Sequence, residues 1–437
     1  MITTPYRDRP VFAPAYAAVA TLVAVVAVGI LVPRQHADSG GEPAPAAQGS
    51  ATPPLLATGT STGPFRPSSV PRPTATGHPA QQAHPPPAPT STSPPPNGPP
   101  TLIGPAAPPG RPTAASVTLA FTGDMLPHVQ IDAQAHADAH GSGYDFRPML
   151  ADVAPVIRGA DWAVCHQETP VSDNDIGVSA YPSFNGPYEL AAAEKWSGYD
   201  SCDTASNHSY DIGAGGIRAT LGTLDRYGIR HVGTARDPAE ASTAVIYDVR
   251  GVKVGHLAYT YGLNGDPTVQ PWMVNMLDPA RVRSDAHRLK QLGADIVIVS
   301  VHAGIEQDQT PSAYQIQVDD EIMQSPDVDL IVGAHAHVVQ PVRRLADGRW
   351  IIYGLGNLLA QQQLDGTTQT PPNRDGVIML PTFRRDGGHY RITSMGYVPT
   401  FVDLPGDHVV YAPGFSHDRT AATLGSMGAP LVDRTPH

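Results

Sequence analysis

The stretch 117–124, VTLAFTGD, decides the fold class because an apolar, β-branched run leads directly into a glycine and an aspartate. Such a run predicts a buried β-strand, and we expect the Gly-Asp pair to form a turn behind it. Four further apolar runs of this kind follow along the chain, at 162–165, 296–301, 330–332 and 350–353. The folded part of the chain is therefore expected to be built around buried strands.

Helical patterns and hairpins separate these strands. Two segments place apolar residues on one helical face and end in a glycine, which is typical of a helix C-cap. These faces are Ile217, Leu221 and Leu224 before Gly228, and Val282, Ala286 and Leu289 before Gly293. The stretches 244–249 and 252–259 predict a hairpin with a tight Arg-Gly turn, and antiparallel pairing is expected around Val377 and Arg391. Strands that alternate with helices and hairpins predict a layered α/β sandwich.

An apolar run at 15–32 is the main feature of the N-terminus. Its length of about 18 residues is near that needed to span a hydrocarbon core, so it predicts a transmembrane anchor. Arg7 and Arg9 precede the run, and the positive-inside rule then places residues 1–14 in the cytoplasm and the remainder outside. A cleaved signal peptide is the competing interpretation, but it requires a shorter apolar region and a small-residue cleavage site. We expect a single-pass protein of the cell membrane with an extracytoplasmic C-terminal domain.

Composition divides the rest of the chain. Residues 33–115 consist mainly of Pro, Ser, Thr, Gly and Ala, which predicts a disordered, partly polyproline linker. We assign residues 116–400 to one folded domain and 401–437 to a C-terminal tail. The formal net charge is −12, so a phosphate backbone would be repelled and nucleic acid is not an expected partner.

Two cysteines, Cys165 and Cys202, are too few for a zinc finger or a disulfide scaffold. Cys165 ends one predicted strand, and Cys202 lies in a short segment before Asn207. If the two segments are neighbours, one disulfide could form in an oxidising compartment. Two buried thiols are the alternative that we expect.

Polar side chains gather directly after the predicted strands, where open α/β sheets place their ligands. The segments are 122–124, 166–168, 206–208, 301–306 and 333–337. Two divalent ions about 3.5 to 4 Å apart repel each other, so they need an anionic bridge besides oxygen and imidazole ligands. Asp124 and Glu168 can supply that charge. His335 and His337 would point to one side of an extended segment, so each could reach a different ion.

Five successive motifs carry a family resemblance. They are Gly123-Asp124; Ala205-Ser206-Asn207-His208 with Asp211 and Gly213; His302-Ala303-Gly304-Ile305-Glu306 with Pro311 and Gln315; Gly333-Ala334-His335-Ala336-His337-Val338-Val339-Gln340-Pro341; and Tyr353-Gly354-Leu355-Gly356-Asn357. Their order over residues 117–383 resembles the bacterial capsule-synthesis family linked to poly-gamma-glutamate (CapA/PgsA). That family is similar in fold to the calcineurin-like metallophosphoesterases, which implies a four-layer α/β/β/α sandwich.

The resemblance implies a role for individual residues. Six of them would hold two divalent ions, either Mn, Fe, Zn or Mg: Asp124 and His337 one ion, Asn207, His302 and His335 the other, and Glu168 a bridge. His208 would be the catalytic residue that protonates the leaving oxygen. Glu306 would orient a neighbouring histidine, and Asn357 would cap or hydrogen-bond a loop near the ions.

The chain departs from the family pattern at three places, one of which is Ala303, where the family has an aromatic residue after the histidine of the third motif. His166-Gln167-Glu168 stands where the family usually has Asn-Leu-Glu. Phosphoesterases carry a histidine two residues after the first aspartate, but that position is Leu126 here. One ion therefore lacks an expected ligand. His166 or His128 could replace it, but each of these histidines could equally support a ligand or face solvent.

Two functions fit these features. The first is a metal-dependent phosphomonoesterase or phosphodiesterase that acts on a cell-envelope polymer or a phosphorylated precursor, such as a lipid-linked phosphate. The second is a non-catalytic component of a capsular polymer assembly or export complex, whose partners would be capsule synthesis and export proteins. A third interpretation, histidines scattered at random, is disfavoured because the histidines follow the strands.

Overall fold

A computed structural model describes residues 100–103, 113–265, 270–362 and 371–436. The predicted anchor at 15–32 and most of the predicted linker lie outside these residues. Among the residues that the structure describes, no helix has both the length and the apolar character needed to cross a membrane.

One mixed sheet of seven described strands forms half of the fold. In their order across the sheet the strands are β1 (Pro100–Ile103), β6 (Ala244–Val249), β7 (Val252–Thr260), β8 (Ile296–His302), β9 (Leu330–Ala334), β11 (Trp350–Ile352) and β10 (Val342–Arg344). Strands β7, β8, β9 and β11 run parallel to one another, so their carboxyl ends meet at one edge. The β6–β7 hairpin is confirmed, with Arg250 and Gly251 both at positive φ in the turn.

A second mixed sheet forms the other half. Its order is β15 (His408–Tyr411), β14 (His389–Asp403), β13 (Asp375–Asp386), β2 (Ser116–Leu126), β3 (Trp162–Gln167), β4 (Ser201–Asp203) and β5 (Arg230–Val232), with β12 (Asn357–Ala360) on β2 and β16 (Leu431–Asp433) on β14. Strands β2 to β5 are parallel, whereas β13 and β14 pair antiparallel, as predicted around Val377 and Arg391.

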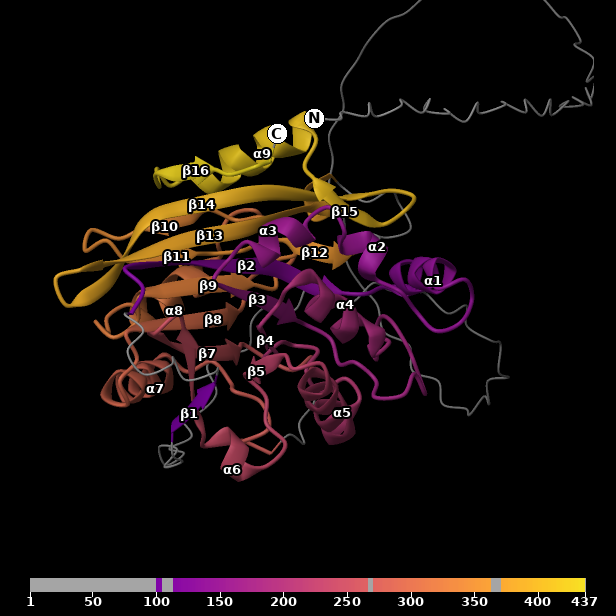
Figure 1. Cartoon of the computed structure of the whole chain (residues 1–437), viewed down its shortest axis with the longest axis horizontal. Coiled ribbons are helices and arrows are strands. Elements are labelled where there is room, and N and C mark those ends of the chain that lie inside the picture. The colour runs from indigo at the N-terminus through magenta and orange to yellow at the C-terminus, as the bar shows by residue number, and fades with distance from the viewer. Residues whose placement is uncertain (1–99, 104–112, 266–269, 363–370, 437) are drawn as a thin grey trace, which may run out of the picture. The chain divides into compact units, whose positions relative to one another are not determined.

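Helices cover the outer faces of the two sheets (Figure 1). The layer against β2–β5 contains α1 (Val129–Asp138), α2 (Arg147–Leu150), α3 (Ala154–Arg158), α4 (Glu189–Ser197) and α5 (Gly213–Arg226). The layer against β7–β9 contains α7 (Pro279–Gln291) and α8 (Ala313–Ile322). The remaining helical segments are α6 (Pro238–Ala241), the 3-10 turn η1 (Pro371–Arg374) and α9 (Gly414–Gly425). The two predicted helices are confirmed, and Gly228 and Gly293 follow them at positive φ.

Side-chain alternation on β2 connects the layers. Leu119 and Phe121 are buried between the sheets, together with Ile296 and Ile298 of β8. Ala120, on the opposite face of β2, belongs to the apolar cluster beneath the helices. Burying a side chain such as Phe121 stabilises the fold by roughly 2 kcal/mol. The predicted layered α/β sandwich is thus confirmed.

Residue Asp124 does not lie in a turn, contrary to our expectation. Strand β2 continues through Gly123 and Asp124 to Leu126, with a register irregularity against β3 between Phe121 and Asp124. A side chain at Gly123 would overlap the carbonyl oxygen of Gly356, and that same oxygen accepts a hydrogen bond from the amide of Asp124. The glycine is required because two backbones approach closely here, not because the chain turns.

Two predicted segment boundaries also need correction. Residues 100–103 fall inside the predicted linker, yet they form β1 and pair in parallel with the edge of β6. The boundary at residue 400 falls inside β14, and β15 and β16 both pair with that strand. The described part of 401–436 therefore completes the second sheet and is not a separate tail.

The expectation of two free thiols is wrong. Cys165 on β3 and Cys202 on β4 occupy directly opposite positions on neighbouring parallel strands and form a disulfide. The sequence could not place them side by side, because β4 is only three residues long and carries little apolar pattern.

Candidate metal centre

The predicted ligands converge where the parallel strands of both sheets end. Asp124 lies near the end of β2, Glu168 directly follows β3, and His302 ends β8. His335 and His337 follow β9. The loop after β4 places Asn207 in the same region, where its Oδ1 lies 2.7 Å from Nε2 of His302.

Two groups of three buried side chains share Glu168. The first group is Glu168, His302 and His335, and the second is Asp124, His166 and Glu168. Within each group, one potential ligand atom from every residue lies within 4.8 Å of the others. A third group consists of His335 and His337 with the exposed Glu306. Glu168 is thus the residue that the two buried groups at this site have in common.

The hydrogen bonding of the buried carboxylates shows whether the site suits a cation. All four carboxylate oxygens of Asp124 and Glu168 are buried and lack a hydrogen-bond donor of suitable geometry among the described residues. A buried carboxylate without donors is costly, because it gives up its hydration shell without replacement. Hard divalent cations prefer carboxylate oxygens and accept imidazole nitrogens, so these residues fit such an ion.

His337 lies within ion-pair distance of both carboxylates. Its Nδ1 lies 3.0 Å from Oδ2 of Asp124 and 3.0 Å from Oδ1 of Asn357, and its Nε2 lies 3.6 Å from Oε1 of Glu168. Burial alone would lower the pKa of His337, but the charge of Glu168 and the contact with Asp124 raise it to about 10. Burial, opposed by His337 and assisted by Asp124, raises the pKa of Glu168 to about 7.

A chain of hydrogen bonds links the two buried groups. Nδ1 of His166 donates to Oδ1 of Asp203, and its Nε2 lies 2.9 Å from Nδ1 of His302. Burial would lower the pKa of His166, but the charge and hydrogen bond of Asp203 raise it to about 9. Burial and the neighbouring His335 lower the pKa of His302 well below its usual range. His302 is therefore neutral, as a metal ligand must be.

The two histidines of the His-X-His motif do not lie in an extended segment. His335 has φ +94° and His337 has φ +56°, in the left-handed region that non-glycine residues rarely adopt. Each such residue costs about 1 kcal/mol or more, and such strain is concentrated at functional sites. The two rings lie 6.0 Å apart, so the bend after β9, not strand alternation, brings them to the site.

His208 lies beside the ligand groups and contacts several neighbours. Its Nδ1 lies 2.8 Å from Oδ2 of Asp211, its ring meets Phe184 edge to face, and its backbone amide donates to Oγ of Ser206. Ser206 also donates to the backbone carbonyl of Glu168. Because Asp211 occupies Nδ1, the Nε2 of His208 remains available to exchange a proton with a bound molecule.

Sequence patterns predicted no role for three residues that hold the site's side chains in place. Asp203 holds His166, and Asp211, noted only as a motif member, holds His208. Nδ2 of Asn207 donates a 3.2 Å hydrogen bond to Oδ1 of Asn264. Asn264 follows β7, which was predicted as a strand, so the rule that polar residues after strands form the site could have found it.

Comparison with known proteins identifies the family. A family model described as bacterial capsule synthesis protein PGA_cap matches residues 118–362. The chain is 27% identical over 286 residues to the capsule biosynthesis protein CapA of Bacillus anthracis, which covers 62% of this chain and 65% of that protein. It is 25% identical over 294 residues to the PGA biosynthesis protein CapA of Bacillus subtilis (strain 168), covering 63% of this chain and 70% of that protein.

A solved structure, the calcineurin-like phosphoesterase YfkN from Bacillus subtilis, superposes with a TM-score of 0.40 and 15% identity, covering 71% of this chain and 96% of that one. The match to the Bacillus anthracis relative spans slightly less than two thirds of that relative's length. Since the family model matches more than half of the residues, the chain belongs to the bacterial capsule synthesis protein PGA_cap family.

Proposed function

We propose that this protein is a metal-dependent hydrolase of the phosphoesterase type, with a site for two divalent ions that share Glu168. The observation that carries the proposal is the membership of Glu168 in both buried ligand groups, with its two oxygens free of hydrogen-bond donors among the described residues. A bridging carboxylate is what two adjacent cations require, because it screens their mutual repulsion.

The protein's own residues have separate tasks in this proposal. Asp124, Glu168, His302 and His335 hold the ions, with His166 and His337 completing the group around Asp124. Divalent cations at such a site would supply Lewis-acid chemistry, polarising a phosphoryl oxygen and making a water molecule more acidic. His208 carries a proton at Nε2 for the leaving oxygen, while Asp211 fixes the ring through Nδ1. Glu306, which is exposed, supports the His335–His337 pair.

The relatives support a place in cell-envelope polymer synthesis. One relative is named for capsule biosynthesis and the other for PGA biosynthesis. We therefore propose that the substrate is a capsular polymer, poly-gamma-glutamate or a related one, or a phosphorylated precursor of it. The apolar run at 15–32 supports a single-pass membrane anchor with the site outside the cell.

A non-catalytic role in polymer assembly or export is the second candidate. Both relatives are named for biosynthesis, which favours a role in building the polymer. In that case the ions would hold acidic groups of the polymer, and no bond would be broken at the site.

One experiment separates the two candidates. The purified full-length chain is loaded with Mn²⁺, Fe²⁺, Zn²⁺ or Mg²⁺ in turn, and its hydrolysis of a generic aryl phosphate is measured. Metal-dependent hydrolysis that is lost in His208→Ala supports the enzyme. Bound metal without any hydrolysis, with an acidic polymer retained only by the metal-loaded protein, supports the assembly role.

A further inference from the structure

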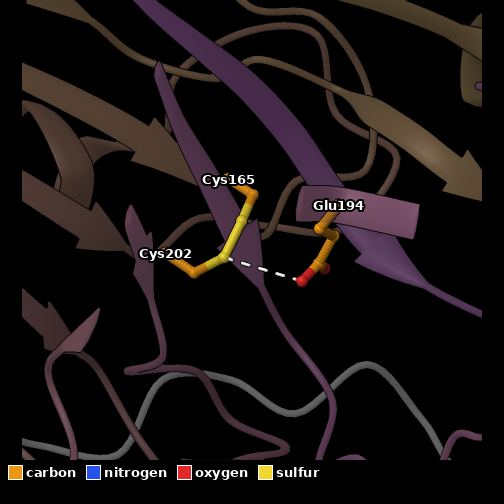
Figure 2. Close-up of side chains that lie close together, drawn as sticks. All are labelled: Cys165, Glu194 and Cys202. Carbon is orange, nitrogen blue, oxygen red and sulfur yellow. Dashed lines mark hydrogen bonds between the residues drawn. A yellow bond between two sulfur atoms is a disulfide. The ribbon is translucent and has the colours of Figure 1, made fainter. Parts of the chain in front are cut away.

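A disulfide joins strands β3 and β4 one residue before the His166–Asp203 pair of the candidate metal centre. Figure 2 shows the sulfur–sulfur bond that joins Cys165 on β3 to Cys202 on β4, with Glu194 of α4 approaching Cys202. The two cysteines occupy opposite positions of the parallel ladder, with their Cα atoms 4.5 Å apart. Both side chains are fully buried beneath the helices that cover this sheet.

The next pair along the same two strands is His166 and Asp203. Side chains alternate between the faces of a sheet, so the cysteines point to the helical layer and the His166–Asp203 pair points to the space between the sheets. His166 and Asp203 line a small cavity there, together with His302 and Ser300. The disulfide and the hydrogen-bonded pair are therefore consecutive cross-strand links on opposite faces of the same ladder.

Strand β4 has little else to fix its register. It is three residues long, and its outer neighbour β5 is also three residues long. A ladder this short supplies few backbone hydrogen bonds, so a covalent link one residue away limits how far Asp203 can slide or tilt relative to His166. The hydrogen bond between His166 and Asp203 depends on that placement.

Glu194 completes the arrangement from α4. Its side chain is fully buried, Oε1 has no hydrogen-bond partner among the described residues, and Oε2 lies 3.8 Å from Sγ of Cys202. A disulfide sulfur carries no proton, so the hydrogen in this contact must come from the carboxyl group. Burial raises the pKa of Glu194 to about 8, consistent with a neutral carboxyl that donates to the sulfur.

We propose that Cys165, Cys202 and Glu194 form an oxidised clamp that positions the His166–Asp203 pair and so shapes the Asp124–His166–Glu168 ligand group. The proposal rests on the proposed function, since it concerns the same metal centre. Closing the clamp is a thiol–disulfide exchange in which the two cysteine thiols give two electrons and two protons to an oxidising disulfide, which becomes a dithiol. Because both sulfurs are buried, small thiols do not reach the closed clamp unless the protein opens.

The double variant Cys165→Ala/Cys202→Ala tests the clamp in the full-length chain. We expect the wild type to bind two Mn²⁺ ions per chain and to show the exchange-coupled electron paramagnetic resonance spectrum of a dinuclear site. The double variant should keep the ion of Glu168, His302 and His335 but lose the other, so that the spectrum becomes that of isolated Mn²⁺. Reduced refolding of the wild type should give the same loss, and reoxidation should restore the second ion.

Leu221→Ala is the matched control, because Leu221 lies in the same apolar cluster but on α5, away from the β3–β4 ladder. It should lower stability without changing the metal count. If the double variant keeps two coupled ions, the clamp proposal is wrong while the proposed function stands.

A wild type that binds no metal overturns the proposed function, and the clamp is then judged on the metal-free protein. Nitrogen-15 histidine spectra should show the Nδ1 proton of His166 strongly shifted by its hydrogen bond to Asp203 in the wild type. Loss of that signal in the double variant, but not in Leu221→Ala, would support the clamp. Its retention in the double variant would overturn it.

Discussion

Oδ2 of Asp124 lies 3.0 Å from Nδ1 of His337, so a strand from one sheet and a loop from the other meet in a buried ion pair. Both side chains are almost completely inaccessible to solvent. The carboxylate oxygens of Asp124 lack a hydrogen-bond donor of suitable geometry among the described residues, so this carboxylate suits a cation. A divalent ion bound here would displace protons from the histidines, because metal ligands bind deprotonated.

Replacing His208 separates proton transfer from metal binding. In His208→Ala we expect kcat for aryl phosphate hydrolysis to fall by roughly 10² to 10⁴, the usual contribution of a general acid, with the bound metal unchanged. Asp211→Asn should give a smaller loss, because the ring keeps its place but loses the carboxylate on Nδ1. His389→Ala, which removes an exposed histidine at the start of β14, serves as the control and should retain full activity. Equal rates in all three variants would remove His208 from the mechanism.

Adding a methyl group at Gly123 tests the close approach of the two backbones. Gly123→Ala would force apart the strand that carries Asp124 and the segment at Gly356, so the free energy of unfolding should fall by about 3 kcal/mol. Gly222→Ala, in the interior of α5 with open space around it, should instead stabilise the protein by roughly 0.5 to 1 kcal/mol. Chemical denaturation of both variants measures the difference. A Gly123→Ala protein as stable as the wild type would mean that the two segments can move apart freely.

The buried carboxyl of Glu194 gives stability a defined pH dependence. Its folded pKa of about 8 lies above the usual value of 4.5 for a glutamate carboxyl, so the folded state holds a proton that the unfolded state loses as pH rises. Its contribution is fully present below about pH 4.5 and is lost by about 1.4 kcal/mol per pH unit up to about pH 8.

Glu194→Gln removes this dependence because an amide stays neutral. Between pH 5 and pH 8, the free energy of unfolding of the variant should rise by roughly 4 kcal/mol relative to that of the wild type. Chemical denaturation at several pH values measures this difference. A constant difference between the two proteins across these pH values would show that Glu194 is ionised in the folded state.

Strong local patterns made most of the fold predictable from sequence. The runs around Leu119, Val164, Ile298 and Ile331 are long and apolar enough to be recognised as strands, and each is a buried strand in the structure. The short strand β4 was not recognised, since three residues cannot show a period. Strand β1 was missed for a different reason: its proline-rich surroundings mask a pairing that β6 provides.

The candidate site was predictable in composition but not in its connections. The rule that ligands follow strands identified Asp124, Glu168 and His302, which the structure brings together with His335. The partnership of His166 with Asp203 depends on the register of β3 and β4, which no local pattern reveals. The positive φ angles of His335 and His337 were equally hidden, because they arise from the bend after β9.

The number of metal ions bound per chain tests the central claim most directly. Elemental analysis of the full-length protein, loaded with Mn²⁺ and then dialysed, should find two ions per chain in the wild type and in Glu321→Gln, a control on α8. In Glu168→Gln, which keeps the shape of the side chain but removes the shared charge, both ions should be lost. A wild type without metal, or a Glu168→Gln protein that still holds two ions, would contradict the account.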